Sequence, residues 1–225
     1  MTRYYPIMLR LEGEQCLVVG GGPVAERRTR GLLDAGAAVR VVAPAATEGL
    51  ERLASEGYIT WVRREYRDED LDGVRLCFAA ADREVNHRVA EEAMRRGILV
   101  NAADDREAGS FAAPAVVRRG RLVLAVTASG ASPALAGRIA RELAERYGES
   151  WADYAEWLHR LRDAARAAVP DARERRRVLR AALDVPEAEW RRDLADGNLA
   201  ARIRELMERP VSPAAEDGMD GTDGE

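Results

Sequence analysis

Three consecutive glycines directly after an apolar run constrain this chain more than any other feature. The run Cys16-Leu-Val-Val19 predicts a buried strand, and Gly20 to Gly22 follow it at once. Glycine reaches backbone conformations that a Cβ forbids, so the chain can turn sharply there and a phosphate can approach the main chain. A helix expected from about Val24 to Ala35 then offers unpaired N–H groups to an anion. Read as Gly20-x-Gly22-x-x-Ala25, the stretch predicts a dinucleotide-binding turn with alanine in the third place.

The rest of the chain alternates in a way that predicts an α/β fold. Strands are expected at 16–19, 38–43, 59–62, 76–81 and 98–101, with helices at 24–35, 48–56 and 84–96, the last capped by Asp82. Such alternation favours a Rossmann-type parallel sheet with helices on both faces. The pattern changes near residue 114, where two strands joined at Arg119-Gly120 predict an antiparallel hairpin. A helix from Pro133 to about Tyr147, with Ser132 as N-cap, should follow.

Beyond residue 149 the strands stop and only helical segments are expected. Trp151, Tyr154, Leu158 and Leu161 form an apolar stripe that we interpret as helix core rather than as a functional aromatic cluster. We therefore divide the chain into a dinucleotide-binding domain over residues 1–112, a hairpin-plus-helix region over 113–148, a small all-helical domain over 149–210 and a disordered acidic tail over 211–225.

Composition excludes several classes of function. All 35 basic residues are arginine, so lysine Schiff-base chemistry and a P-loop lysine are ruled out. A net charge of −4 with few aromatic residues gives no nucleic-acid footprint. Cys16 and Cys77 lie in apolar runs without further metal-ligand spacing, and we predict buried free thiols and no metal site. No apolar run is long enough to cross a bilayer and no secretory signal is present, so we expect a cytoplasmic protein.

Polar residues at the carboxyl end of the fifth predicted strand are the best candidates for chemistry. Asp104 and Asp105 are adjacent, and in an extended segment they point apart, so one would be an acid or base and the other a turn residue. Position alone does not choose between them, or between this and two plain loop carboxylates. Asn101 is a secondary candidate, because a buried amide must find a partner or a ligand. His87 and His159 are expected to have surface or packing roles.

One feature of the dinucleotide fold is missing from the sequence. An acidic residue usually follows the second strand and binds the adenine ribose, but here that place reads Val42-Ala-Pro-Ala45. We expect main-chain groups at this turn, together with Gly20 to Val24, to hold the cofactor. The sequence does not separate NAD from NADP.

Seven motifs occur in an order that resembles the precorrin-2 dehydrogenase family, whose members are found alone or as the amino-terminal half of siroheme synthases. The motifs are Tyr5-Pro-Ile7, Gly20-Gly-Gly-Pro-Val-Ala-Glu-Arg-Arg28, Val42-Ala-Pro44, Ala80-Ala-Asp82, Asn101-Ala-Ala-Asp-Asp105, Phe111-x-x-Pro114 and Ser129-Gly-Ala-Ser-Pro133. The resemblance implies NAD-dependent oxidation of precorrin-2 to sirohydrochlorin by a homodimer that dimerises through the region 113–148. Some members also insert ferrous iron.

The resemblance also implies roles for individual residues. It places the functional carboxylate on Asp104. It places NAD at Gly20, Gly21, Gly22, Pro23, Val24, Pro44, Ala45 and Asp82, and the tetrapyrrole at Asn101, Ser129, Gly130 and Ser132. Ala128 and Ala131 stand where hydroxyl residues are common in this loop. Because precorrin-2 carries eight carboxylates, arginines near the site loops, such as Arg106, Arg118, Arg119 and Arg138, have an evident task. The alternative function is a regulatory module that binds NAD without catalysis.

Overall fold

The amino-terminal sheet is organised around its central strand. The computed structural model describes residues 4–105 and 107–209. In β1 (Gln15–Val19), the side chains of Leu17, Val18 and Val19 are almost completely buried. The parallel sheet has the order β3-β2-β1-β4-β5, formed with β2 (Ala38–Val42), β3 (Ile59–Val62), β4 (Leu76–Ala79) and β5 (Leu99–Ala102). The predicted Rossmann-type sheet is confirmed, and its strand order reverses between β1 and β4, where folds of this type bind ligands.

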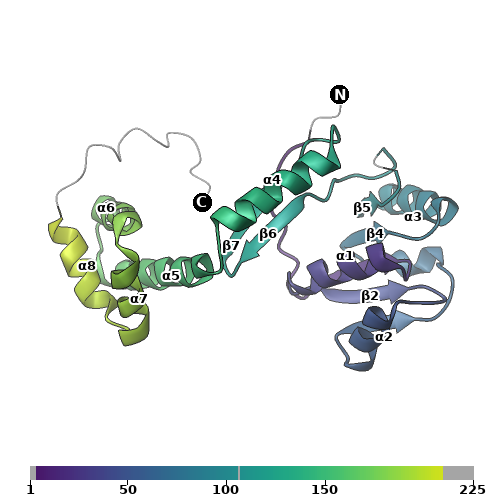
Figure 1. The fold of residues 1–225 in the computed structure, drawn as a ribbon. Helices are drawn as coiled ribbons and strands as arrows, with labels where there is room; N and C mark the ends of the chain where they lie inside the picture. The colour runs from purple at the N-terminus through teal and green to yellow at the C-terminus, as the bar shows by residue number, and fades with distance from the viewer. Residues whose placement is uncertain (1–3, 106, 210–225) are drawn as a thin grey trace. The chain divides into compact units, whose positions relative to one another are not determined.

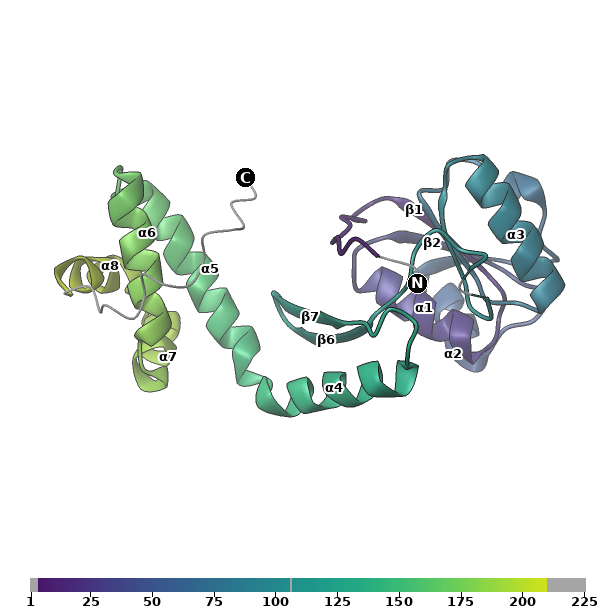
Figure 2. The same cartoon turned by 90° about the horizontal axis from the view of Figure 1, so that it is seen from above.

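Helices cover both faces of this sheet, as the alternation predicted. On one face α1 (Pro23–Leu33) and α2 (Glu48–Ser55) pack against Cys16 and Val18 of β1. On the other face α3 (Arg83–Arg95) packs against Leu17 and Val19. Figures 1 and 2 show α1 and α2 on one side of the strands and α3 on the other. Alternate residues of one strand therefore supply two separate cores.

The described residues group into two compact units. One unit is Met1–Pro114 with Thr127–Pro133, and the other is Ala115–Val126 with Ala134–Glu225. The second unit contains the hairpin of β6 (Ala115–Arg119) and β7 (Leu122–Val126), and then α4 (Pro133–Arg146), α5 (Ser150–Ala168), α6 (Ala172–Ala181), a 3-10 turn (Ala182–Asp184), α7 (Glu187–Asp196) and α8 (Leu199–Glu208). The predicted hairpin and helices are confirmed. The predicted tail lies outside the described residues.

The helical part of the second unit has its own core. Leu161 is completely buried, while Tyr154 and Leu158 pack against the core from its edge, as the predicted stripe requires. The largest buried side chain, however, is Trp157, which the stripe omitted. It lies three residues after Tyr154 and four before Leu161, so it belongs to the same helix face.

Of the helices that the structure describes, none combines the length and the apolar character that a bilayer crossing requires. Both cysteines are buried free thiols, as predicted. Burial raises the pKa of the Cys16 thiol to about 11, and it raises that of Cys77 further. Neither is therefore a thiolate near neutral pH.

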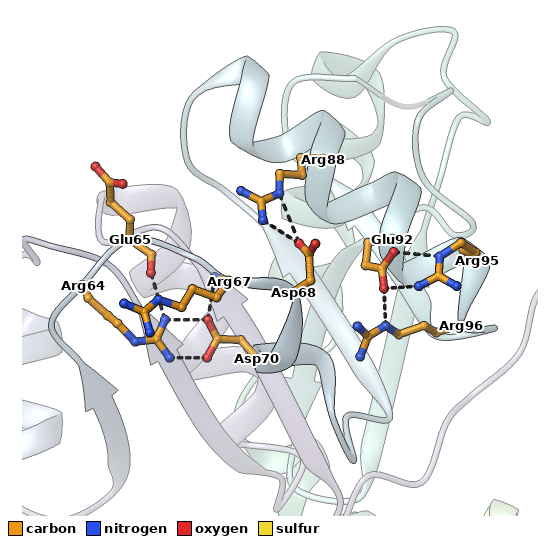
Figure 3. A network of polar contacts seen from close by, with 9 residues as sticks. All are labelled: Arg64, Glu65, Arg67, Asp68, Asp70, Arg88, Glu92, Arg95 and Arg96. Carbon is orange, nitrogen blue, oxygen red and sulfur yellow. Dashed lines mark hydrogen bonds and ion pairs between the residues drawn. The ribbon is translucent and has the colours of Figure 1, made fainter.

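A buried carboxylate fastens a turn that the sequence did not predict. Between β3 and β4 the chain forms a single 3-10 turn, η1 (Asp68–Leu71), in which Asp70 is 5% exposed. Its carboxylate accepts two hydrogen bonds from the Arg64 guanidinium, at 2.8 and 2.6 Å, and one from the Arg67 main-chain N–H at 2.9 Å (Figure 3). The Asp70 carbonyl oxygen accepts a further bond from Arg40 in β2. Asp70 thus bonds the turn to β2 and to the segment after β3, and the neighbouring Leu71 packs into the core with Leu17 and Val19.

Asp70 should make the stability of this unit depend on acid. Burial acts to raise its pKa, but the bonds from Arg64 and Arg67 outweigh burial and leave it below the ordinary value. Its stabilising effect should therefore be complete above about pH 5 and decline as the pH falls through the lowered pKa. We expect Asp70→Asn to destabilise the sheet clearly at pH 7 and much less at pH 3. Urea unfolding, monitored by hydrogen exchange of the main-chain amides in β1 and β2, measures this difference in stability.

Asp72→Asn is the matched control, because Asp72 is exposed and pairs with Arg96 on the surface. It should change stability little at either pH. An equal loss for Asp70→Asn at both pH values would contradict the ionic role of Asp70.

Candidate functional site

Two glycines bring three loops together at the carboxyl edge of the sheet. Gly20 has φ +119°, and a Cβ there would lie 2.2 Å from the carbonyl oxygen of Ala80. A Cβ on Gly21 would lie 1.9 Å from the carbonyl oxygen of Ala45. Neither distance is compatible with any side chain, so the loops after β1, β2 and β4 can meet only because these positions are glycine. The predicted residues Gly20, Gly21 and Ala45 are therefore close neighbours.

The third glycine is different, because the space around it is open. Apart from its chain neighbours, no described residue has an atom within 4 Å of a Cβ built on Gly22, which is the N-cap of α1. Pro23 occupies the first helical position, and no described side chain caps this end of the helix. The N–H groups of Val24 and Ala25 in the first turn therefore remain for an anion. The turn fits the diphosphate of a dinucleotide, with room for it beside Gly22.

The turn after β2 is held by Thr47 rather than by an acid of its own. The Thr47 main-chain N–H donates to the Gly21 carbonyl oxygen at 2.9 Å, and its hydroxyl donates to the Glu26 carboxylate of α1 at 2.6 Å. Gly49 leaves room for this carboxylate, since a Cβ there would lie 2.1 Å from Glu26 Oε1. The bonds from Thr47 and then Arg30 lower the pKa of Glu26. The turn that contains Pro44 and Ala45 is thus bonded through Thr47 to the loop after β1 and to α1.

A side chain that the sequence analysis overlooked organises the loop after β4. Asn86 of α3 is 1% exposed, and its Oδ1 accepts from the main-chain N–H of Ala81 at 2.8 Å. Its Nδ2 donates to the Ala81 carbonyl oxygen at 3.2 Å. These bonds explain why β4 ends at Ala79 and not at the predicted Ala81, because Ala81 pairs with a side chain instead of a strand. The Asp82 carboxylate caps α3, as predicted, by accepting a hydrogen bond from the main-chain N–H of Val85.

The second Nδ2 hydrogen of Asn86 is directed at Asp104. It donates to Asp104 Oδ1 at 2.6 Å, across the gap between α3 and the loop after β5. The orientation of the amide is fixed, because Ala81 N–H can donate only to the oxygen side of Asn86. Asp104 itself is exposed. The arrangement presents a carboxylate at the edge of the sheet and holds one of its oxygens still.

The neighbouring acid, Asp105, is a turn residue. Its Oδ1 accepts from the main-chain N–H groups of Glu107 and Ala108, which is the Asx-turn pattern. The loop returns to β5 through Ser110, whose N–H donates to the Val100 carbonyl oxygen at 2.8 Å. The two acids thereby differ in their geometry. The Asp105 carboxylate is hydrogen-bonded within its own loop, whereas Asp104 is exposed. The role of Asp104 in catalysis stays a prediction.

Asn101 has the partner that its burial required. Its Nδ2 donates to the Phe111 carbonyl oxygen at 2.9 Å, and Asn101 is the register neighbour of Phe78 in the sheet. Phe111 packs edge-on against Phe78, with ring centroids 5.4 Å apart. These contacts hold the segment after the Asp104 loop against the strands.

The predicted loop from Ser129 to Ser132 groups with the amino-terminal unit. Ser129 has φ +47°, an uncommon value for a residue other than glycine, and its N–H donates to the Thr127 hydroxyl at 3.1 Å. Gly130 follows with φ +90°. Substrate contacts of Ser129, Gly130 and Ser132 stay predictions.

Two side chains, Asn86 and Arg28, were not predicted from the sequence. Asn86 stands four residues after the helix cap Asp82, a spacing that places it one turn into α3, at the strand ends. Arg28 was noted only as part of a motif, and its burial became evident in the structure. Of the predicted surface histidines, His87 is exposed and His159 pairs with Asp163. Within residues 4–105 and 107–209, no three His, Cys, Asp or Glu side chains are grouped as metal ligands.

Comparisons with known proteins agree with this geometry. The family described as "Putative NAD(P)-binding" matches residues 7–115, so this part of the chain is of the NAD(P)-binding type. A siroheme synthase of Chromobacterium violaceum is 39% identical over 95% of this chain, which spans only 45% of that relative. A precorrin-2 dehydrogenase of Priestia megaterium is 36% identical over 70% of this chain and 78% of its own length.

A solved structure supports the same assignment. The structure of the precorrin-2 dehydrogenase SirC superposes with a TM-score of 0.72 at 31% identity, and the match covers 92% of this chain and all of SirC. The chain also spans about half the length of the siroheme synthases that it matches. On sequence identity, coverage and fold together, the chain belongs to the precorrin-2 dehydrogenase family.

Proposed function

We propose that this chain oxidises precorrin-2 to sirohydrochlorin in siroheme synthesis, with NAD as the hydride acceptor. The observation that carries the proposal is the Asp104 carboxylate, held by Asn86 at 2.6 Å on the edge of an NAD(P)-type sheet. The names of the relatives, siroheme synthase and precorrin-2 dehydrogenase, support the choice of substrate.

The reaction transfers a hydride to the cofactor and a proton to the protein. The macrocycle loses one hydride and one proton, and bound NAD supplies the acceptor for the hydride. Asp104 takes the proton as general base. Asn86 fixes Asp104 Oδ1, so that Oδ2 remains for the substrate. Because Asn86 is neutral and is itself bonded to Ala81, it orients the carboxylate without bringing a positive charge to it.

The cofactor site rests on main-chain groups. The first turn of α1, from Gly22 to Val24, would hold the diphosphate, and the turn at Pro44 and Ala45 would hold the adenine ribose. Because the Asp82 carboxylate caps α3, this residue would contact the cofactor through its main chain. NAD rather than NADP is the cofactor that the resemblance to the precorrin-2 dehydrogenase family implies, and the incubation described below compares the two.

Other expectations remain predictions at this stage. They comprise insertion of ferrous iron, a homodimer formed through residues 113–148, and a cytoplasmic location.

The alternative function, an NAD-sensing module, predicts dinucleotide binding without turnover. Anaerobic incubation of the protein with precorrin-2 and either NAD or NADP separates the two functions. The dehydrogenase should change the tetrapyrrole spectrum and raise nicotinamide absorbance together, whereas the sensor should change neither.

The open space at Gly22 should be needed for the cofactor and not for folding. Because no protein atom lies near a Cβ at this position and φ is −83°, Gly22→Val should fold normally. It should weaken NADH binding about tenfold or more, because its side chain occupies the space beside the first turn. Fluorescence titration with NADH and a melting curve measure both effects.

Gly31→Ala in the same helix is the control, since beyond its own helix its Cβ also meets no atom of a described residue within 4 Å. It should leave NADH binding unchanged. Normal NADH affinity in Gly22→Val would place the diphosphate elsewhere.

Replacing the proposed base should reduce turnover strongly. Asp104→Asn keeps the size of the side chain and an acceptor for Asn86, but removes the basic oxygen. We expect kcat to fall about 10²- to 10⁴-fold. Asp105→Asn is the matched control, because an amide oxygen can still accept from Glu107 and Ala108, and its kcat should stay near that of the wild type. Initial rates of NADH formation provide the measurement. Similar effects of the two variants would contradict the assignment of Asp104.

Asn86 should act through the position of Asp104. Asn86→Ala removes the donor at 2.6 Å, and we expect kcat to fall about 10- to 100-fold. The KM for precorrin-2 should change less than about threefold, because Asn86 does not contact the substrate in this proposal, whereas the KM for NAD should rise, because Ala81 loses both of its bonds to Asn86 in the loop that leads to Asp82. Steady-state kinetics with both substrates varied measures the split. A rise in KM at unchanged kcat would be inconsistent with a positioning role.

A further inference from the structure

Arg28 is a half-buried cation without a counter-ion among the residues that the structure describes. It lies in the second turn of α1, and its guanidinium carbon is 5.1 Å from the centroid of the Phe78 ring. Its Nε is buried and has no hydrogen-bond partner in the part of the chain that the structure describes. Burial, and secondarily the adjacent Arg27, lower the pKa of Arg28. Both effects destabilise the charged form of the Arg28 side chain in this environment.

Among the described residues of the same unit, Arg40 also has a buried Nε without a partner, but its guanidinium donates to the Asp70 carbonyl oxygen, and two other arginines have carboxylate partners. Arg30, on the same helix, pairs with Glu26 at 2.7 Å, and Arg64 pairs with Asp70 at 2.6 Å. In residues 4–105 and 107–209, Arg28 forms no ion pair within 4.0 Å. Its aromatic contact is a weaker compensation for burial than a carboxylate would be. A cation kept in this state indicates a binding site for an anion from outside the unit.

The surroundings of Arg28 point to a particular kind of anion. Phe78 is the register neighbour of Asn101, and Phe111 packs edge-on against Phe78. The same two strands, β4 and β5, lead at their carboxyl ends to Asn86 and Asp104. A ligand here therefore meets the guanidinium N–H groups of Arg28 beside the partly buried ring of Phe111, on the Asp104 half of the sheet. That combination suits a flat ring system with carboxylate arms.

A phosphate of the dinucleotide fits this place less well. Arg28 follows Gly22 by six residues, about 9 Å along the helix axis at 1.5 Å per residue. The helix end at Gly22, with its open space and uncapped turn, already provides for the diphosphate. Arg28 is turned instead toward Phe78 of β4.

We propose that Arg28 binds a peripheral carboxylate of the tetrapyrrole, and so fixes how the macrocycle is oriented above β4 and β5. This inference rests on the proposed function for its substrate class. It adds a recognition residue to the amino-terminal domain that is distinct from the base, Asp104, and from the cofactor turn.

The test compares direct binding of sirohydrochlorin by three proteins in the absence of NAD. Arg28→Met keeps much of the apolar stem that covers Phe78 but removes the charge. Arg27→Met removes one charge from the adjacent, exposed position. Absorbance titration should give an affinity for sirohydrochlorin about 10- to 100-fold weaker in Arg28→Met, and unchanged within about twofold in Arg27→Met. NADH affinity should be unchanged in both.

Each other outcome has a defined meaning. Equal affinities for sirohydrochlorin in the two variants would overturn the proposal, and so would a loss of NADH binding alone, which would assign Arg28 to the cofactor. Should Arg28→Met fail to fold, Arg28→Gln takes its place under the same criteria. If the wild type binds sirohydrochlorin but does not oxidise precorrin-2, the proposed function fails while the Arg28 comparison still decides this inference. If the wild type binds no sirohydrochlorin, both fail.

Discussion

The contact of two glycines with two carbonyl oxygens is the constraint on which the candidate site depends. A side chain at Gly20 would collide with Ala80, and one at Gly21 would collide with Ala45. The loops after β1, β2 and β4 can therefore converge at the point where the strand order reverses. Without this convergence, the first turn of α1 would not lie beside the strand ends that position Asn86 and Asp104. These glycines therefore allow the loops of the candidate site to meet, in addition to the phosphate-binding role that the proposed function gives to this turn.

The convergence also connects the cofactor turn to the proposed base through few bonds. Ala80 touches Gly20, the next residue Ala81 is bonded twice to Asn86, and Asn86 holds Asp104. Each link uses main-chain groups or a buried amide, which have little conformational freedom. A carboxylate held this way is already oriented before substrate arrives, and preorganisation of this kind lowers the cost of reaching the transition state.

The sequence predicted what depends on local pattern, and it missed what depends on contacts between distant segments. Apolar periodicity and glycine positions were sufficient for the parallel sheet and the order of its helices. The 3-10 turn at Asp70 was not predicted, because Asp70 is bonded to Arg40 of β2 and to Arg64, which follows β3, in addition to its local bond from Arg67. The role of Asn86 was not predicted either, because its partners Ala81 and Asp104 lie 5 and 18 residues away in the sequence. Burial of Arg28 against Phe78 has no signature in the sequence.

The distribution of charge separates structural residues from candidate functional ones. Other buried or half-buried charges have polar partners, since Asp70 pairs with Arg64, Asp193 pairs with Arg202, and Arg40 donates to the Asp70 carbonyl oxygen. At the carboxyl edge the described partner of Asp104 is a neutral amide, and the described partner of Arg28 is an aromatic ring. A carboxylate paired with arginine is a weaker base, and an arginine paired with a carboxylate is less able to bind another. Neutral partners therefore leave one negative and one positive charge for the ligand, which suits a substrate that must give up a proton and carries carboxylates.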